Sequence, residues 1–284
     1  MYRINEIIIK EQLNDSVVKM VIYSPLVSRK CEPGEFIILR PKETSERIPL
    51  TIAGYNREDE TVTIIFQTIG MTTMELSTLN VGEQIHDFVG PLGKPTVLDG
   101  YKNVCVIGGG VGCAIALPVV QKLHMLKANV HSIIGFRNKD LIILEKEFNE
   151  SSNLLKVMTD DGSYKEKGFV TSALEELIQK GNNYDLVVTI GPLPMMKAVV
   201  NITKKYNIKT IVSMNPIMID GTGMCGCCRL MCNGKMKFAC IDGPDFDGFE
   251  VDFDEAINRS KTYQSFERQK RDEFCNLMKE RPNE

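Results

Sequence analysis

Five of the nine cysteines in this chain fall between Cys225 and Cys240, within sixteen residues. In a reducing compartment such crowding indicates a metal or an iron–sulfur cluster rather than disulfides. Plant-type [2Fe–2S] loops space their ligands as Cys-x4-Cys-x2-Cys, with a fourth cysteine later in the chain. The sequence Asp220-x4-Cys225-x2-Cys228-x11-Cys240 repeats that spacing, with a carboxylate in the first position.

A carboxylate is acceptable there because it is anionic and binds ferric iron, although it is a harder ligand than a thiolate. The intervening glycines suit a loop that wraps closely around a cluster and offers backbone N–H groups to its sulfurs. We therefore predict a [2Fe–2S] cluster on Asp220, Cys225, Cys228 and Cys240. Two alternatives stay open: Cys232 is the fourth ligand, in a cluster or in a zinc site, or the cysteines are structural and bind nothing.

A second group of reactive side chains lies nearer the N-terminus, in Arg47-Ile-Pro49-Leu50-Thr51-Ile52 and in Gly70-Met-Thr72-Thr73. Taken singly, these are an ordinary surface arginine and a turn. Together they resemble the flavin motif of the ferredoxin-NADP reductase family. The resemblance implies that the charged fork of Arg47 pairs with phosphate and that Thr51 lies beside flavin N5 as the residue nearest the chemistry. It also implies that Gly70, Thr72 and Thr73 hold the pyrophosphate, with Pro49, Leu50 and Ile52 completing the FAD site.

A third group begins with Gly108-Gly109-Gly110-Val111-Gly112, between a predicted strand at 104–107 and a predicted helix at 113–126. A glycine turn between strand and helix suits a pyrophosphate, although Cys113 takes the last position of a full Gly-x-Gly-x-x-Gly. The later sequence Gly191-Pro192-Leu-Pro-Met195 resembles the loop with which the same reductases close over nicotinamide. Arg137 and the pair Asp160-Asp161 follow the next two strands and are candidates for the ribose, which leaves NADH against NADPH open.

The elements that must position these groups divide the chain into four parts. Apolar runs at 6–9, 17–23, 36–40 and 61–68 are typical of a small antiparallel barrel, and the Gly/Pro-rich run 90–95 suggests its end. Beyond it, strands predicted at 104–107, 130–134, 154–158, 186–190 and 210–213 alternate with helices predicted at 113–126, 141–148, 169–180 and 193–206. That alternation predicts a doubly wound α/β sheet. We assign 1–96 to a flavin-binding β-barrel, 97–213 to a nucleotide-binding domain, 214–251 to the cluster segment and 252–284 to a charged helical tail.

The bulk composition excludes several classes of protein. The 284 residues carry a net charge of −3, with no basic field to gather a nucleic acid. The uncharged stretch 104–120 holds four glycines and a proline and is too short to span a bilayer, so no membrane partner is expected. The N-terminal residues mix charged and apolar side chains without a signal-peptide core. We expect a cytoplasmic protein.

The combination of a flavin barrel, a nucleotide domain and an aspartate-containing cluster motif is similar to one family over nearly the whole chain. It resembles the small subunit of NADH-dependent ferredoxin:NADP oxidoreductases, also called sulfide dehydrogenase beta subunits, which are related to dihydroorotate dehydrogenase electron-transfer subunits. The resemblance implies FAD, one [2Fe–2S] cluster, NAD(H) and a larger flavin and iron–sulfur subunit as heterodimer partner. In that family electrons are bifurcated: NADPH is oxidised while ferredoxin, reached through the large subunit, and NAD are reduced.

Two other functions stay open at this point. The chain is also compatible with an electron-transfer subunit of a dihydroorotate dehydrogenase complex, which normally carries four cysteines at the cluster. A function of another class is a zinc-stabilised binding protein on a degenerate nucleotide fold.

Overall fold

The computed structural model describes residues 2–280, with side chains described up to residue 273. Its N-terminal part is an antiparallel barrel made of two sheets, in the orders β1-β2-β6-β5 and β4-β3-β7. Buried aliphatic side chains from both sheets, such as Ile7, Ile22, Ile37 and Ile64, fill the space between them. The elements are β1 (Glu6–Asn14), β2 (Val17–Tyr23), α1 (Pro25–Ser28), β3 (Phe36–Arg40), β4 (Ile48–Thr51), β5 (Gly54–Asn56), β6 (Thr61–Gln67), α2 (Met71–Thr78) and β7 (Asp87–Leu92).

Two features of the barrel differ from the sequence prediction. The segment after Gly70 forms helix α2, which has no apolar stripe to reveal it. The run 90–95 is not wholly a linker, because Gly90, Pro91 and Leu92 continue strand β7. A Cβ on Gly90 would lie 2.6 Å from Cγ2 of Ile37, so glycine allows β7 to lie close against β3.

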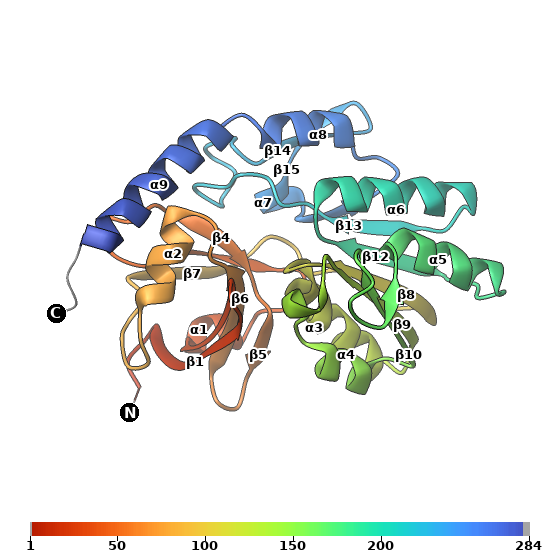
Figure 1. Ribbon diagram of the computed structural model, residues 1–284, viewed down its shortest axis with the longest axis horizontal. Helices are drawn as coiled ribbons and strands as arrows, with labels where there is room; N and C mark the ends of the chain where they lie inside the picture. The colour runs from red at the N-terminus through yellow and green to blue at the C-terminus, as the bar shows by residue number, and fades with distance from the viewer. Residues whose placement is uncertain (1, 281–284) are drawn as a thin grey trace.

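The second part is a doubly wound α/β domain, as predicted (Figure 1). Its sheet has the order β11-β10-β9-β8-β12-β13-β16, and every pairing is parallel except that of β16 with β13. Alternate residues of β8 face opposite layers: Val104 and Val106 pack with α3 and α4, whereas Cys105 and Ile107 pack with α5 and α6. The elements are β8 (Asn103–Gly109), α3 (Gly112–Met125), β9 (Asn129–Phe136), η1 (Lys139–Leu141), α4 (Glu145–Ser151), β10 (Leu154–Thr159), β11 (Glu166–Lys167), α5 (Val170–Gln179), β12 (Leu186–Ile190), α6 (Leu193–Lys205) and β13 (Thr210–Ser213).

One predicted helix in this domain is wrong in its bounds. The segment 141–148 is not continuous, because Leu144 adopts a left-handed backbone conformation with φ of 61°. A short 3₁₀ turn ends at Leu141 and α4 begins only at Glu145.

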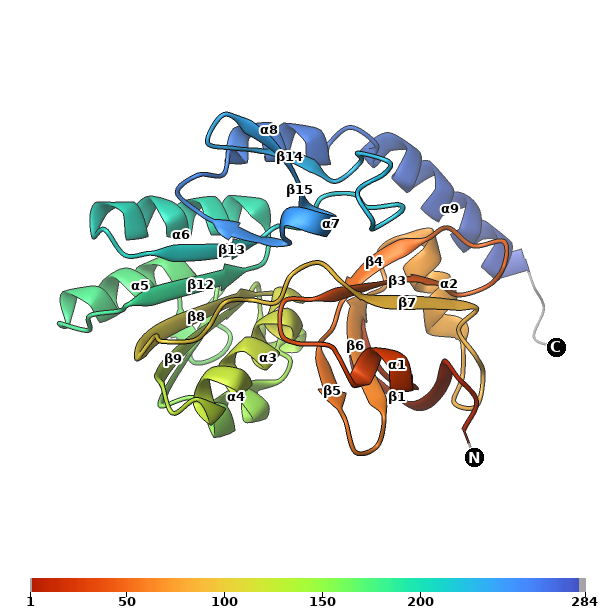
Figure 2. The same ribbon diagram turned by 180° about the vertical axis from the view of Figure 1, so that it is seen from behind.

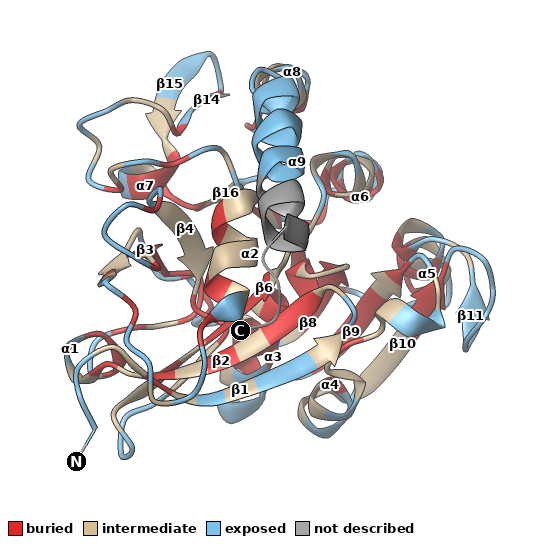
Figure 3. Ribbon diagram, turned by 60° about the vertical axis from the view of Figure 1, so that its left-hand side comes forward, coloured by how far each residue is buried: buried red, intermediate tan, exposed pale blue. Residues whose placement is uncertain are grey.

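The C-terminal segment crosses over both of the preceding parts (Figures 1 and 2). Its hairpin and short helix had no periodic signal in the sequence. β16 extends the nucleotide-domain sheet, α8 packs on α6, and α9 reaches α2 of the barrel. Figure 3 shows α9 exposed over its described side chains, in contrast to the buried strands β8 and β9. The elements are β14 (Arg229–Cys232), β15 (Lys235–Phe238), α7 (Ala239–Asp242), β16 (Asp245–Asp247), α8 (Phe253–Ser260) and α9 (Gln264–Glu280). Within residues 2–280, no helix is long and apolar enough to cross a membrane.

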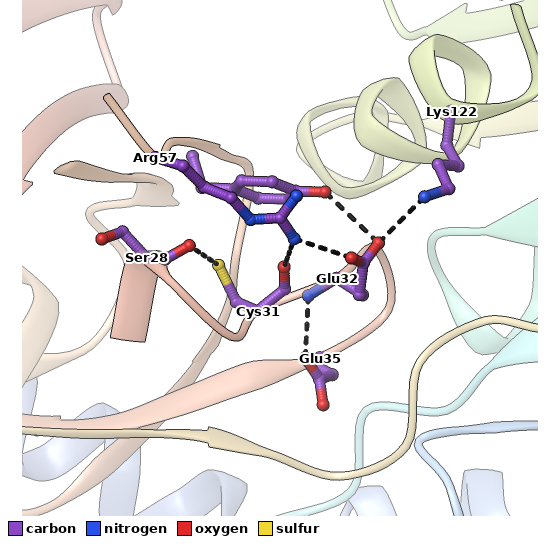
Figure 4. Close-up of polar contacts among 7 residues, drawn as sticks. Ser28, Cys31, Glu32, Glu35, Arg57 and Lys122 are labelled. Atoms are coloured by element: carbon purple, nitrogen blue, oxygen red, sulfur yellow. Dashed lines mark hydrogen bonds and ion pairs between the residues drawn. The ribbon is translucent and has the colours of Figure 1, made fainter. Parts of the chain in front are cut away.

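An ion cluster around Glu32 joins the barrel to the nucleotide domain (Figure 4). The Glu32 carboxylate accepts hydrogen bonds from Arg57 at 2.7 Å and from Lys122 of α3 at 3.3 Å. Arg57 also lies over the ring of Tyr55, 4.9 Å from its centroid. Burial opposes ionisation of Glu32, but the two cations outweigh it and lower the carboxyl pKa. The cluster therefore favours the charged form of Glu32 in the folded chain.

We predict that Glu32→Gln lowers the free energy of unfolding by about 1 kcal/mol at pH 7, because it leaves the half-buried Lys122 and the exposed Arg57 without their anion. A lowered carboxyl pKa stabilises the fold above its usual value of 4.5, and this contribution is lost as the pH falls through the folded-state pKa. The difference between variant and parent should shrink below pH 4.5. Denaturant unfolding at several pH values measures it, with the exposed Glu58→Gln as control; a gap that widens in acid contradicts the assignment.

Candidate functional site

A cleft of about 1030 Å³ opens between the barrel and the carboxyl ends of the nucleotide-domain strands. Ligands bind at this edge of doubly wound sheets. Many of the predicted site residues line it: Pro49, Thr51, Gly109, Gly110, Val111, Gly112, Arg137, Asp160, Gly191, Pro192 and Met195.

The glycine loop after β8 is packed too tightly for side chains. A Cβ on Gly109 would lie 2.4 Å from Sδ of Met195, and one on Gly112 would lie 2.6 Å from the carbonyl oxygen of Ile190. Gly110 has φ of 55° and donates its N–H to the Gly135 carbonyl at 2.9 Å. These contacts place the first residues of α3 at the wall of the cleft. The N–H groups of Cys113 and Ala114 already donate to the carbonyls of Gly110 and Val111, which leaves those of Val111 and Gly112 as donors at the start of this helix. The arrangement suits a pyrophosphate.

The outer end of the cleft carries one cation and one anion. Arg137 and Asp160 follow the neighbouring strands β9 and β10, and both line the cleft. Asp161 is turned away: its carboxylate accepts the Ser163 N–H at 2.9 Å, and the Ser163 hydroxyl and amide lower its pKa. Of the two predicted aspartates, only Asp160 is placed to meet a nucleotide in the cleft.

On the barrel side, the structure brings Pro49 and Thr51 to the cleft but not the rest of the predicted flavin residues. Ile52 packs in the barrel core, with Leu50 against it. The hydroxyl of Thr73 accepts the Gly70 N–H at 3.0 Å and donates to the Gly70 carbonyl at 2.9 Å, which closes the first turn of α2. The assignment of these residues to the flavin stays a prediction, as it does for Arg47 and Thr72, which also lie outside the cleft lining. The assignment of Gly108 to the nicotinamide nucleotide stays a prediction for the same reason.

Sequence reasoning missed much of the cleft wall. Asn14, Ser16 and Gln67 are isolated polar residues at strand ends and carried no motif. The segment from Ser213 to Met218 directly follows the buried strand β13. The rule that ligands meet the carboxyl ends of parallel strands would have found this segment, although its composition does not.

Two of the predicted cluster ligands lie side by side because of the hairpin between them. Strands β14 and β15 pair Arg229 with Phe238, so the residues just outside this open end also meet. The sulfurs of Cys228 and Cys240 are 3.2 Å apart, and the Cys240 N–H points at the Cys228 sulfur at 3.5 Å. Both cysteines are buried, and burial raises the pKa of Cys240 to about 12. A pair of close, buried thiols is a reasonable half of a cluster site.

The other two predicted ligands, Asp220 and Cys225, sit on the loop that leads to this pair. Backbone N–H groups of Cys227 and Asp220 face the Cys225 sulfur and lower its pKa. The hydroxyl and amide of Thr222 lower the pKa of Asp220, and the charge of Arg47 adds to the effect. Backbone N–H groups directed at a thiolate stabilise its charge, as a sulfur ligand of an iron–sulfur cluster requires. The surroundings of Cys225 and Asp220 therefore fit ligands of a [2Fe–2S] cluster. Among residues 2–280, however, no three His, Cys, Asp or Glu side chains converge as one metal site.

The position of Cys232 argues against it as the fourth ligand. It lies at the far end of β14, three residues beyond Arg229, which corresponds to about 10 Å along a strand. Ligand sulfurs of one zinc ion lie within about 4 Å of each other, since each Zn–S bond is about 2.3 Å. Cys232 instead pairs with Val251 and is buried in the core of this segment. The hairpin therefore argues against Cys232 as a ligand of the same metal ion as Cys228 and Cys240, and Asp220 as the fourth ligand stays a prediction.

Comparison with known proteins agrees with this geometry. The iron–sulfur cluster binding domain of dihydroorotate dehydrogenase B matches residues 215–252. A homologue of the dihydroorotate dehydrogenase B (NAD⁺) electron transfer subunit from Thermotoga maritima is 42% identical over 265 residues, 93% of each chain. The electron transfer subunit itself from Shouchella clausii is 32% identical over 82% of this chain and 91% of its own length. A solved structure described as an NADH-dependent reduced ferredoxin-NADP oxidoreductase, studied for flavin-based electron bifurcation, superimposes with a TM-score of 0.92 at 39% identity, covering 97% and 99% of the two chains.

We predict that Gly112→Ala destabilises the chain by about 1–3 kcal/mol, because its Cβ would meet the backbone of Ile190 in a buried strand. Thermal unfolding of the purified chain measures the loss. Gly54→Ala is the matched control, since a Cβ there meets Thr63 at an ordinary 3.6 Å. Equal unfolding temperatures for the two variants would show that the glycine loop is looser than described.

We predict that Cys240→Ala loses most of its iron and that Cys232→Ala retains it, because only Cys240 lies at the ligand pair. Iron content and the EPR spectrum of anaerobically purified protein give the answer. Asp220→Ala should alter the EPR signal or weaken the cluster. Iron loss in Cys232→Ala together with an unchanged spectrum in Asp220→Ala would make Cys232 the fourth ligand, and stoichiometric zinc without iron would replace the cluster by a zinc site.

Proposed function

This chain belongs to the family of dihydroorotate dehydrogenase B electron-transfer subunits and their homologues, and we propose that it is the NAD(H)-linked subunit of an electron-bifurcating NADH-dependent ferredoxin:NADP oxidoreductase. It exchanges electrons between NAD(H), FAD and a [2Fe–2S] cluster. The observation that carries this choice is the match to the bifurcating reductase along both chains. The aspartate in the first ligand position of the cluster motif supports the same choice.

The cleft residues divide between two ligands. We assign Thr51, Pro49 and the neighbouring barrel residues to FAD, with Arg47 supplying positive charge for its phosphate. The glycine loop, Arg137, Asp160 and the loop from Gly191 to Met195 are assigned to NAD(H). Bound FAD would supply the exchange between single electrons and a hydride, so the protein needs no acid or base of its own for the hydride step. The chain's contribution is to hold the two rings together and to exclude water.

The cluster segment is held against the flavin-binding barrel, which supports electron exchange between them. A Cβ on Gly221 would lie 2.9 Å from side-chain atoms of both Ile38 and Leu92. Arg47 is near enough to Asp220 for its charge to act on that carboxyl. The residues assigned to the two redox groups are therefore in electrostatic contact.

Relatives named as electron transfer subunits work with a partner subunit, and we propose a larger flavin and iron–sulfur subunit in a heterodimer. We propose that exposed apolar side chains of the cluster segment, led by Met224, which is 88% exposed, form one patch. Such a patch is typical of an interaction surface. Ferredoxin would exchange electrons through the larger subunit, and the cytoplasmic location expected from the sequence is part of this proposal. The other members of the patch are Ile217, Ile219, Met236 and Ile241.

A second candidate is the electron-transfer subunit of a dihydroorotate dehydrogenase, which the names of several relatives favour. Affinity purification under anoxic conditions separates the two. A ferredoxin- and NADPH-active partner supports the bifurcating complex, whereas an enzyme of pyrimidine synthesis supports the second candidate.

We predict that the anaerobically purified chain contains FAD and iron, that NADH bleaches the flavin absorbance, and that Arg47→Ala loses most of its FAD, because the phosphate loses a charged partner. Flavin content after desalting is the measurement. Arg29→Ala, which removes only an exposed ion pair with Glu60, is the control. Full flavin in Arg47→Ala contradicts the role of Arg47, and a colourless parent chain contradicts the whole proposal.

A further inference from the structure

The carboxyl group of Asp245 stands out among the described residues because one of its oxygens is sealed from solvent beside the cleft and the groups around it are neutral, although the residue as a whole is half-buried. One oxygen, Oδ2, accepts a hydrogen bond from the Thr96 hydroxyl at 2.5 Å. The other, Oδ1, is sealed from solvent and accepts no hydrogen bond of normal geometry, although the Ser213 hydroxyl is close enough to lower the carboxyl pKa. A buried carboxylate with an unsatisfied oxygen is costly, so such a group calls for an explanation.

Asp245 lies where the three parts of the chain meet. Thr96 comes from the connection that follows the barrel, and a Cβ on Gly34, in the turn before β3, would lie 3.1 Å from Oδ2. Across the strand pair β13–β16, Asp245 is the direct partner of Ser213. Ser213 and Pro244 both line the cleft. The carboxyl group is thus one side chain behind the cleft wall.

Among the residues that the structure describes, no cation acts on this group. Burial raises the pKa of Asp245 to about 6, while the hydroxyls of Thr96 and Ser213 act in the opposite direction. The charged residues on the segments packed around it are Glu32, Glu35, Lys94 and Asp247. Glu32 is paired with Arg57 and Lys122, Glu35 accepts the Glu32 N–H at 2.8 Å, and Asp247 is exposed at the other end of β16. None of them contributes to the shift of the Asp245 pKa.

We propose that Asp245 is a proton-linked positioning residue, which takes up a proton through Ser213 when the flavin in the cleft is reduced and releases it when hydride leaves. The inference rests on the proposed function, which supplies the flavin and, through the cluster, its electrons. Reduction of an oxidised flavin by two electrons at neutral pH adds one proton at N5 and leaves a monoanion. A second negative charge on Asp245 would repel this monoanion across a low-dielectric wall.

The proton balance follows from this repulsion. Where Asp245 is ionised before reduction, two electrons enter the cleft with two protons from solvent, one bound at flavin N5 and one on Asp245. Hydride transfer to NAD⁺ then removes the N5 hydrogen with both electrons, and Asp245 returns its proton to solvent. Reduction therefore leaves the net charge of the cleft unchanged, because each electron is matched by a proton, and this avoids the cost of charging a low-dielectric site.

The test is proton uptake by the flavin-loaded chain during anaerobic two-electron reduction, measured with a pH indicator between pH 5 and 8, together with the pH dependence of the flavin potential. Between pH 7 and 8 the parent should take up more protons than Asp245→Asn, by up to one per flavin, and the difference should vanish at pH 5, where Asp245 is already protonated and flavin N1 takes up a proton in both proteins. Above pH 7 the potential of Asp245→Asn should change with pH up to twofold less steeply than that of the parent. Asp247→Asn, on the same strand but exposed, is the matched control and should follow the parent.

Two results overturn the proposal. The first is equal proton uptake and equal slopes in the parent and in Asp245→Asn, since a purely structural role changes stability but not these quantities. The second is an Asp245 carboxyl that titrates near its usual value of 3.8 in an isotope-labelled sample, a measurement that does not depend on bound flavin. Failure of the chain to bind flavin at all would instead contradict the proposed function, so the two failures are distinguishable.

Discussion

The close contact between the cluster loop and the barrel is the constraint on which the rest of this structure depends. Gly221 packs on Ile38 and Leu92 at a distance that no side chain would allow. Around this contact, the same core unites Phe36 and Ile38 of the barrel, Met196 and Val200 of α6 and buried residues of the cluster segment, Cys228 and Cys240 among them. Because interiors are close-packed and transmit strain, the ligand pair is fixed relative to both domains rather than to its own hairpin alone. Electron exchange between a cluster and a flavin requires such a fixed separation.

The hairpin β14–β15 shows how little local sequence is needed to build half of a metal site. Its two strands are only four residues each, and an isolated hairpin of this length is marginal in water. The buried side chains of Leu230 and Cys232 hold it against the rest of the segment. Cys232 thus stabilises the hairpin whose open end presents Cys228 and Cys240, which accounts for one of the two cysteines outside the predicted ligand set.

Much of the fold was predictable because its signals are local. The apolar runs of the barrel and the strand–glycine–helix passage around Gly109 follow directly from the sequence, and both are confirmed. Helix α2 was missed since its core contact is essentially one residue, Leu76. The spacing of Asp220, Cys225, Cys228 and Cys240 predicted the chemistry of the cluster segment but not its hairpin, which depends on pairings across the chain. The cleft wall was only partly predictable. A glycine-rich turn indicates that backbone or ligand atoms pack closely against it, whereas Ser213, Met214 and Asn14 line the cleft only because of where the fold places them.

Glu32 and Asp245 show that burial alone does not decide the charge of a carboxyl group at the joint between the two domains. Burial acts against ionisation at both positions. Glu32 forms ion pairs with Arg57 and Lys122. Because the attraction to these two cations exceeds the desolvation cost, Glu32 is ionised at neutral pH and links the two domains. Asp245 meets only hydroxyl groups, which stabilise an anion far less than a cation does, and its pKa therefore moves to about 6. Glu32 therefore keeps its charge at neutral pH and loses it only in acid, as a structural ion pair requires. The charge of Asp245 can instead change close to neutral pH, as a group that responds to charge in the cleft requires.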